Sequence, residues 1–461
     1  MDKNVVKNLA GIVGEAFVSD HPEELFMYSR DGGTQDPMNP DCVVMPKTTG
    51  EVQRIILYAN ENRIPIVPLG AGLVLSGLSR AIRGGIVLDM KRMCHIIEVN
   101  EKSRYAVVEA GVSEGMLKAY LEKHHPRLKH SLPDAPPMAT IGGNVLIHGS
   151  GHLSQATGFH SEMLNGLEVV LPTGEICRIG SCAASPYWFS RAPLPDLAGL
   201  FVGWNGTTGV MTKLAIKLYP KPRYDDVMLF VTENPDLLPD IVLRITETEM
   251  GEDLVIMAQP KPDWIGGFQL TSVGVTGHSE KEIKFKKKTI RMALDDYIQR
   301  KEGGFMHLVP EMKAGFTEAP QRSVTRFADV KKGGGFEYVG AIMPVELLPQ
   351  AYRDGIDIAL RNGTSYSIMI RIVGRAHCMM AAYAYGFNRA DLEDVKKAQH
   401  ALHEANQSAL KLGGIPWKSE LPGQHLIIEQ MDPNTFDLMT RVKKTLDPNG
   451  IMNPGNWERA R

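Results

Sequence analysis

Glycine-rich turns that follow short apolar runs are the feature that most limits how this chain can fold. The first turn, residues 70–77, comes directly after an apolar run at residues 64–69 that is expected to be a strand. Glycines at such a position let backbone N–H groups converge on a phosphate, because no Cβ stands in the way. The spacing matches neither the G-x-G-x-x-G fingerprint nor the P-loop with its Gly-Lys-Ser/Thr. Taken alone, the loop is either a phosphate cradle or an ordinary turn.

Helical and strand patterns are mixed along residues 1–222, which predicts an α+β fold. Apolar residues recur at helical spacing after Glu51, and Ser113 is expected to cap a helix that runs to His124. Strand-like runs are expected at residues 64–69, 85–89, 105–111, 167–175 and 214–219. Pro220 and Pro222 stiffen the chain and stop regular pairing. We therefore expect a domain boundary there, with a second α+β region beyond it.

Charge balance and cysteine usage exclude several classes of protein. Lys and Arg number 51 against 53 Asp and Glu, so no basic excess indicates a nucleic-acid partner. The 5 cysteines form no C-x-x-C pair, so we expect no iron–sulfur cluster, zinc knuckle or disulfide framework. No uncharged apolar run approaches the ~18 residues that a membrane span needs. We therefore expect a cytoplasmic protein without a membrane span.

Two more glycine clusters accompany the first, at residues 141–144 and 199–209. In this context the chain resembles the vanillyl-alcohol oxidase/p-cresol methylhydroxylase family of flavoproteins, through the ordered segments PLGAGLVLSG, IVLDMKRM, PDAPPMATIGGN, LEVVLPTGE, GLFVGWNGTTGVMTKLAIKL and LDPNGIMNPGNW. The resemblance covers nearly the whole chain. It implies a two-part FAD-binding domain at residues 1–222, an α+β cap domain over the flavin ring at residues 223–440, and a tail at residues 441–461 that returns to the FAD-binding domain.

The resemblance also implies one FAD, with its pyrophosphate at the loop of residues 70–77. Backbone dipoles would neutralise the diphosphate, since no Lys or Arg lies between Leu69 and Ser79. The residues expected to contact FAD are Pro68, Gly70, Ala71, Gly72, Leu73, Val74, Ser76, Pro133, Asp134, Ile141, Gly142, Gly143, Asn144, Gly149, Gly151, His152, Gly209, Val210 and Asn453.

The cofactor is expected to be bound noncovalently. Many relatives attach FAD to a histidine in this loop, but Leu73 stands at the matching position, so that linkage cannot form. The other family attachment lies on a cap strand, where the candidates are His377, Tyr383 and Tyr385. His377 is out of register with that attachment, so we expect it to be a core or hydrogen-bonded side chain.

Two branches of the family suggest different substrates. The 2-hydroxy-acid branch resembles the chain in GLFVG, GTTG and LDPNGIMNPG. That branch carries a Gly-His-x-Gly-Asp-Gly-Asn-x-His metal stretch and a later Glu-His-Gly. The corresponding segments here, residues 374–380 and 418–423, contain one histidine and no acidic partner beside it, so we expect no metal site.

The phenol-oxidising branch resembles the chain around Pro416-Trp417-Lys418, which aligns with a Tyr-Arg pair that holds a substrate phenolate. Trp417 replaces the tyrosine, and His152 stands where another phenolate-binding tyrosine is expected. We expect the catalytic residues to be Asp134, Arg375, His377, Trp417 and Lys418, with Lys418 holding the anion and Asp134 as acid/base partner. The alternatives are a core indole for Trp417, a surface amine for Lys418 and a simple turn at Asp134.

These inferences predict an FAD-dependent dehydrogenase or oxidase. Hydride would pass from an activated C–H or CH–OH carbon of a small aromatic, 4-hydroxybenzyl-type substrate to flavin N5. Electrons would leave to a separate carrier, a cytochrome, an electron-transferring flavoprotein or an iron–sulfur subunit, because the chain has no cluster or haem motif. A homodimer is the expected assembly. The alternatives are a 2-hydroxy-acid dehydrogenase and a flavin-binding protein without catalysis.

Overall fold

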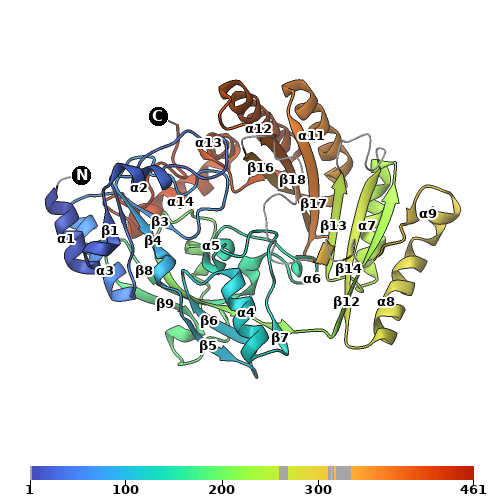
Figure 1. Cartoon of the computed structure of the whole chain (residues 1–461), viewed down its shortest axis with the longest axis horizontal. Coiled ribbons are helices and arrows are strands. Elements are labelled where there is room, and N and C mark those ends of the chain that lie inside the picture. The colour runs from blue at the N-terminus through green and yellow to red at the C-terminus, as the bar shows by residue number, and fades with distance from the viewer. Residues whose placement is uncertain (1–2, 259–267, 310–312, 314–315, 318–333, 461) are drawn as a thin grey trace.

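The computed structural model describes residues 3–258, 268–309, 313, 316–317 and 334–460, and its mixed sheets and helices confirm the α+β fold (Figure 1). The first sheet runs in the order β1 (Val18–Ser19), β2 (Cys42–Val44), β4 (Ile86–Asp89) and β3 (Ile66–Leu69). Strands β2, β4 and β3 are parallel, while β1 is antiparallel to β2. The nearby helices are α1 (Lys3–Val13), α2 (Pro22–Met27) and α3 (Thr49–Glu61).

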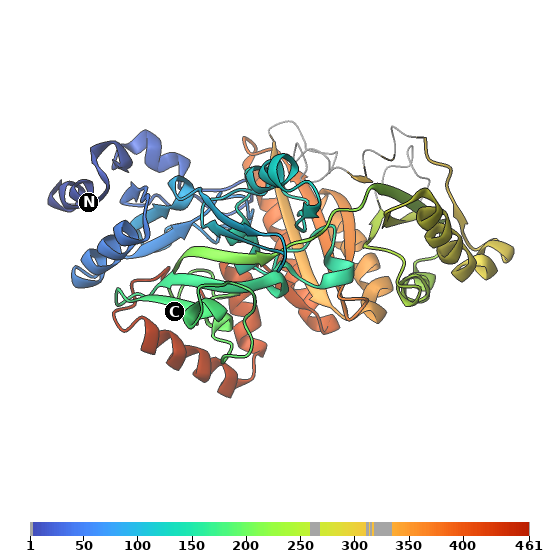
Figure 2. The same ribbon diagram turned by 90° about the horizontal axis from the view of Figure 1, so that it is seen from below.

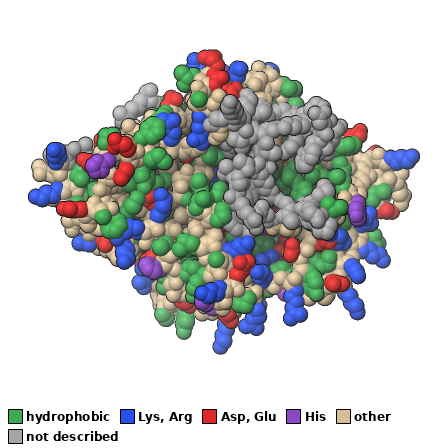
Figure 3. Space-filling model, viewed as in Figure 1, with side chains coloured by type: hydrophobic (Ala, Val, Ile, Leu, Met, Phe, Trp, Pro, Cys, Tyr) green, Lys and Arg blue, Asp and Glu red, His purple; other side chains and the backbone are tan. Residues whose placement is uncertain are grey.

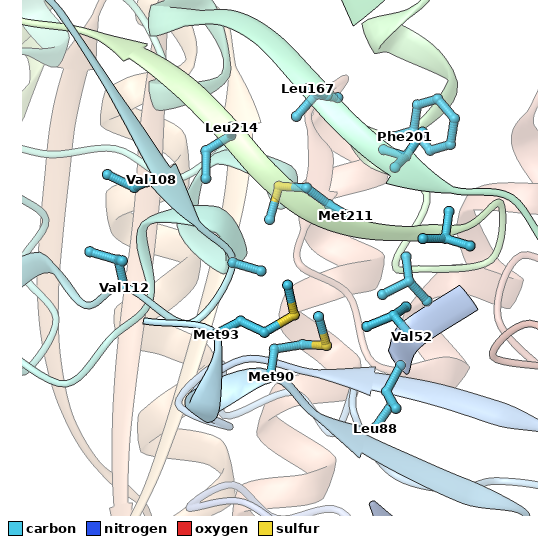
Figure 4. Packing of buried hydrophobic residues seen from close by; sticks show 14 of the residues in the cluster. Val52, Leu88, Met90, Met93, Val108, Val112, Leu167, Phe201, Met211 and Leu214 are labelled. Carbon is cyan, nitrogen blue, oxygen red and sulfur yellow. The ribbon is translucent and has the colours of Figure 1, made fainter. Parts of the chain in front are cut away.

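The second sheet is antiparallel and shares one core with the first. Its order is β5 (Ile96–Asn100), β6 (Tyr105–Glu109), β10 (Val210–Lys217), β8 (Leu164–Val170) and β9 (Ile176–Gly180). Helix α3 packs on β8 and β10. Figure 4 shows Leu88 and Met90 on the side of the first sheet and Val108 and Leu214 on the side of the second.

Shorter elements connect these sheets to the site. Strand β11 (Tyr219–Pro220) pairs with β7 (Leu128–Lys129). The helices in this part are α4 (Glu114–His124), α5 (Ile141–Leu146) and α6 (Ser154–Thr157). Ser113 caps α4 as predicted, since its Oγ accepts a hydrogen bond of 3.2 Å from the backbone N–H of Met116.

A larger antiparallel sheet lies beside these two (Figure 2). Its order is β15 (Gly304–Phe305), β12 (Tyr224–Thr232), β14 (Gln269–Gly277), β13 (Asp253–Ala258), β17 (Ser365–Val373), β18 (Cys378–Phe387), β16 (Gly335–Met343) and β19 (Ile415–Trp417). The helices of this half are α7 (Leu238–Glu247), α8 (Glu280–Ala293), α9 (Asp295–Gln299), α11 (Leu348–Asn362), α12 (Leu392–Leu412) and α13 (Leu421–Gln430). The division at residues 222 and 440 remains a prediction.

Alternation along the strands of the larger sheet gives it two different faces. Because successive side chains of a strand point to opposite faces, one face buries an aliphatic set against α7, α8, α11 and α12, including Leu254, Ile256, Ile368, Ile370, Ile372, Met379 and Ala381. The other face carries Val255, Met369, Val373, Met380 and Ala382. Arg371 has the same parity as Met369 and Val373, so it belongs to this second face.

The end of the chain returns to the first sheet. Helix α14 (Pro433–Leu446) is followed by a turn that brings Met452 beside Ile66 of β3. The backbone N–H of Ile66 donates to the carbonyl of Ile451 at 2.7 Å, and the N–H of Asn453 donates to the carbonyl of Ile66 at 2.8 Å. The strand that leads into the glycine loop is therefore held by β4 and by the C-terminal segment.

Charged side chains of both signs are scattered over the face shown in Figure 3, in keeping with the formal net charge of -2. Among the residues that the structure describes, no helix is long and apolar enough to cross a bilayer.

Candidate active site

A cavity lies between the glycine loop after β3 and the second face of the larger sheet. On the loop side it is lined by Pro68, Leu69, Gly70, Ala71, Gly72, Leu73, Val74, Leu75, Leu78 and Ser79. On the sheet side it is lined by Tyr338, Met369, Met380, Trp417 and Lys418. The cavity therefore joins a backbone-rich end to an end built from sulfur, aromatic and amine groups.

A close side-chain contact explains one glycine of the loop and a left-handed backbone explains another. A Cβ on Gly70 would lie 2.4 Å from Oγ1 of Thr140, which itself caps α5 by accepting from the N–H of Gly143 at 3.3 Å. Gly72 adopts a φ of +68°, a conformation that favours glycine. No charged side chain lines the cavity between Pro68 and Ser79. Such a loop can hold a diphosphate through backbone dipoles, and the placement of the FAD diphosphate there remains a prediction.

The structure brings most of the expected cofactor residues to this cavity. Its lining includes Pro68, Gly70, Ala71, Gly72, Leu73, Val74, Pro133, Asp134, Gly143, Asn144, Gly209 and Val210. The expected residues outside its lining are Ser76, Ile141, Gly142, Gly149, Gly151, His152 and Asn453. Asn453 acts indirectly, since its side-chain amide donates to the carbonyls of Leu78 at 3.2 Å and Asn205 at 2.6 Å. Direct contact of each residue with FAD remains a prediction.

A buried ion-pair cluster lies beside the cavity. Arg371 on β17 donates from Nε and Nη2 to the two carboxylate oxygens of Asp253 on β13, each at 3.0 Å, and from Nη1 to Asp134. His152 Nε2 lies 3.4 Å from Asp134 Oδ1, and His152 Nδ1 lies 3.9 Å from Asp253 Oδ2. Burial opposes ionisation of Asp134, but Arg371 and His152 outweigh it and hold the pKa of that carboxyl well below its usual range.

Lys418 is a cation in a different situation. It lines the cavity, and its Nζ lies 3.6 Å from the centroid of the Trp417 ring. The indole is held in place because its Nε1 donates to the carbonyls of Ile147 at 3.2 Å and His148 at 3.1 Å. Tyr338 packs edge-on against it. Burial lowers the pKa of the Lys418 ammonium to about 7.

A buried polar chain holds Asn144 at the cavity wall. The Asn144 amide donates to Oε1 of Glu114 at 2.9 Å and to Nδ1 of His160 at 2.5 Å. Burial, together with the nearby charges of His130, Arg371 and Lys418, lowers the pKa of His160 to about 3. The ring is therefore neutral, and because Nδ1 is an acceptor, its proton sits on Nε2 and is donated to Ser131 Oγ at 2.7 Å.

A strap of residues 31–36 fastens the glycine loop to the larger sheet. Asp31 accepts from the N–H of Gly77 at 2.7 Å, and Oε2 of Glu337 on β16 accepts from both the N–H and the Oγ1 of Thr34 at 2.7 Å. Glu337 is buried, and this burial, with Glu420 and Asp31 nearby, raises its pKa to about 8. At neutral pH the strap therefore contacts an uncharged carboxyl group.

The expected catalytic residues are only partly brought together. Asp134, Trp417 and Lys418 line the cavity. Arg375 and His377 are exposed in the turn between β17 and β18, and neither lines it. Arg375 instead pairs with Glu249 on the surface at 2.9 Å.

Among the groups at this site that sequence reasoning missed are Arg371, Asp253, Tyr338 and the two methionines Met369 and Met380. The signal for Arg371 was a single charged residue within the apolar strand run SIMIRIV. A cation inside such a buried, alternating run needs a carboxylate partner. No comparable signal marks Asp253 or Tyr338.

Comparisons with known proteins agree with this geometry. A family model described as an FAD binding domain matches residues 40–180, and one described as the C-terminal domain of FAD linked oxidases matches residues 340–457. Glycolate oxidase subunit GlcD of Bacillus subtilis (strain 168) is 27% identical over 473 residues, covering 98% of this chain and 96% of that protein. The mitochondrial D-lactate dehydrogenase [cytochrome] of Arabidopsis thaliana is 24% identical and covers 98% of this chain and 80% of its own.

Solved structures of similar fold include two enzymes of aromatic substrates. The 4-ethylphenol oxidase from Gulosibacter chungangensis has a TM-score of 0.86 at 23% identity, covering 98% of this chain and 96% of its own. A p-cresol methylhydroxylase with substrate bound has a TM-score of 0.86 at 21% identity, covering 99% and 96%. At these identities the likeness concerns the fold.

Proposed function

Because the chain belongs to the FAD-linked oxidoreductases of the vanillyl-alcohol oxidase and p-cresol methylhydroxylase type, we propose that it oxidises a small aromatic, 4-hydroxybenzyl-type substrate. The single observation that carries this proposal is the make-up of the cavity. A glycine loop suited to a diphosphate forms one end, and Tyr338, Met369, Met380 and Trp417 with Lys418 form the other.

The residues present fit FAD. Gly70 leaves the space that a Cβ would fill against Thr140, and the lining residues from Pro68 to Ser79 offer backbone dipoles and carry no charged side chain. The loop after β3 would hold the diphosphate, and Pro133, Asn144 and Val210 would contact the rest of the cofactor. When bound, FAD supplies a hydride acceptor at N5.

The sheet-side wall suits an aromatic ring that carries a hydroxyl or another anionic group. Methionine sulfurs and aromatic edges make favourable contacts with rings. A phenolate oxygen pushes hydride away from the carbon opposite it, and a nearby cation such as Lys418 lowers the pKa of the phenol. Asp134 would lie on the flavin side of the same cavity. Arg375 and His377, which do not line it, have no part in this proposal.

The cofactor would be held without a covalent bond. His377 is exposed, and the hydroxyl of Tyr383 donates to the carbonyl of Ala351 on the helix-covered face of the sheet. Tyr385 has the same parity as Tyr383 and is buried on that face. A cytoplasmic location, a homodimer and a separate electron carrier remain proposals that follow from the sequence.

A 2-hydroxy-acid dehydrogenase is the second candidate function, favoured by the full-length similarity to glycolate oxidase subunit GlcD. Lys418 would then hold the substrate carboxylate. Within the described part of the chain, no group of three His, Cys, Asp or Glu side chains is placed to hold a metal ion. A hydroxy acid would therefore depend on Lys418 and on the backbone.

Anaerobic flavin bleaching separates these functions. The purified holoprotein is mixed with 4-hydroxybenzyl alcohol, benzyl alcohol, glycolate or D-lactate, and the absorbance of oxidised flavin is followed. We expect bleaching by 4-hydroxybenzyl alcohol, unchanged by a chelator. Bleaching by the hydroxy acids alone would refute the aromatic proposal, and its loss on chelation would indicate the metal-dependent branch. A protein that binds FAD but is bleached by none of these compounds or their homologues would be a flavin-binding protein without catalysis.

A further inference from the structure

Lys418 lines the sheet end of the cavity, and Arg371 lies in the ion-pair cluster beside it. Arg371 has three hydrogen bonds to two carboxylates, from Asp134 and Asp253. Its positive charge is therefore compensated by two carboxylates. Lys418 makes no ion pair within the part of the chain that the structure describes, and its amine borders the open cavity.

Asp134 is poorly suited to accept a proton. Its Oδ2 is held by Arg371 and its Oδ1 faces His152. A proton arriving there would have to replace the charge-assisted contact with Arg371. The same contact holds the pKa of Asp134 well below its usual range, which makes the carboxylate a weak base at neutral pH.

We propose that Lys418, as the uncharged amine, is the catalytic residue that removes the hydroxyl proton of the substrate, while Asp134 stays ionised as the partner of Arg371. This inference rests on the proposed function, because it assumes a hydroxylated substrate in the cavity. Burial supports it by lowering the pKa of Lys418 to about 7, so that the free amine is the main form at mildly alkaline pH. Three titratable groups lie near Lys418: Tyr338 on β16, which packs on Trp417, His160, whose pKa is lowered by burial and by charges that include that of Lys418, and Glu420, two residues further along the chain. Arg371 on β17, with Asp134 and His152 beside it, forms the neighbouring ion-pair cluster.

The surroundings of Lys418 can accommodate both its free amine and its ammonium form. Its backbone has a φ of +55°, in the left-handed region that non-glycine residues seldom occupy, which directs the side chain back over the indole of Trp417. The low-polarity cavity favours the free amine before reaction. After proton uptake, the face of the indole stabilises the ammonium through a cation–π contact.

Atoms and charge balance in this step. The substrate O–H bond breaks, its proton forms a bond to Nζ of Lys418, and the electron pair stays on oxygen. That oxygen would then form a π bond towards the ring or the carbinol carbon as hydride left the carbon, and FAD, held by the loop after β3, would supply the two-electron acceptor. The substrate would lose one proton and one hydride in total, and Lys418 would later return its proton to solvent.

An arginine substitution separates proton removal from charge, because arginine keeps the cation but does not become a free amine near neutral pH. Anaerobic stopped-flow reduction of the holoenzyme is measured across pH with 4-hydroxybenzyl alcohol and with 4-hydroxy-3-nitrobenzyl alcohol, whose nitro group lowers the pKa of the phenol so that it is ionised at the alkaline end of the range, where the two compounds are compared. In wild type we expect the rate with the first compound to rise with pH through about 7. Lys418→Arg should remove this rise and slow the reaction about 100-fold.

The ionised nitrophenol should be less affected, with a wild-type to Lys418→Arg ratio within about tenfold, since it needs no base. Lys418→Met should slow both compounds. Lys411→Arg, a change at an exposed lysine near the end of α12, is the matched control and should behave as wild type. Unchanged flavin spectra would show that each variant binds FAD.

Equal wild-type and Lys418→Arg rates with 4-hydroxybenzyl alcohol would overturn the proposal, because Lys418 would then act only as a fixed cation. So would equal slowing of both phenols by Lys418→Arg. If neither phenol but a 2-hydroxy acid reduces the flavin, the proposed aromatic function fails separately. The pH profile of Lys418→Arg with that acid then tests Lys418, and a retained rise through about pH 7 would refute its role.

Discussion

Replacing Arg371 with methionine removes the cation that lies between two buried carboxylates. Arg371 is 2% exposed in its side chain, and its guanidinium bonds to Asp134 and Asp253, whose side chains are each 14% exposed. Breaking a buried ion pair by removing one partner typically costs about 3–5 kcal/mol, because the remaining charge stays buried without compensation. We expect a loss of this size in the free energy of unfolding, measured by urea titration of the holoprotein at saturating FAD.

The pH dependence of this loss gives its cause. In wild type the pKa of Asp134 is lowered on folding, so its stabilising effect is complete above the unfolded value of about 4 and is lost only at lower pH. In Arg371→Met that cation is gone, and burial, which raises the pKa of Asp134, is no longer opposed by it. Stability of the variant should therefore fall as pH rises above about 4, and the deficit at pH 7 should shrink at pH 5.

Two control variants test whether the loss of stability comes from buried charge left without a partner. Arg375→Met breaks an exposed pair with Glu249, and surface pairs of this kind are worth about 1 kcal/mol or less. Adding Asp134→Asn and Asp253→Asn to Arg371→Met should recover most of the lost stability, because no buried charge then remains. A loss no larger than that of Arg375→Met, or one that the two asparagines do not relieve, would show that the cluster is not a compensated buried ion pair.

Three further outcomes are expected. Gly70→Ala should weaken FAD binding at least about tenfold in a fluorescence titration, because its Cβ would displace Thr140; unchanged affinity would show that the loop can shift freely. Because the pKa of Glu337 is raised in the folded state, its ionisation lowers the free energy of unfolding as pH rises from about 5 to 8, and Glu337→Gln should reduce this decline; a wild-type slope in urea titrations would contradict this. Acid precipitation should leave FAD in the supernatant, because Leu73 offers no attachment; a yellow pellet would show a covalent bond.

The sequence predicted what depends on local pattern and missed what depends on distant pairing. The loop at residues 70–77 was predicted because an apolar strand followed by glycines is a local signal, and Trp417 and Lys418 line the cavity as expected. Arg371 and Asp253 are 118 residues apart and meet only through the register of β13 and β17. No local sequence pattern indicates that these two residues are in contact.

The arginine expected at the site, Arg375, lies four positions further along the β17–β18 hairpin than the arginine found beside the cavity, Arg371. The resemblance placed Arg375 at the site, but that residue lies in the turn after β17 and points to solvent. Arg371 lies on the strand itself, with the parity that faces the cavity. Which strand residues face a site depends on where the strand ends and the turn begins, and that boundary is the least certain part of a reading from sequence.

The return of the chain to β3 has a consequence for biosynthesis. Ile66 and the loop that follows leave the ribosome long before Ile451 and Asn453, whose hydrogen bonds hold the base and the far side of that loop. During translation the nascent loop therefore lacks these supports, although the strands around it are already present. A chain truncated before residue 451 would keep nearly all of its sheets and helices yet bind flavin weakly. The absorbance of bound flavin per chain in a preparation would then measure the fraction of chains that carry the C-terminal segment.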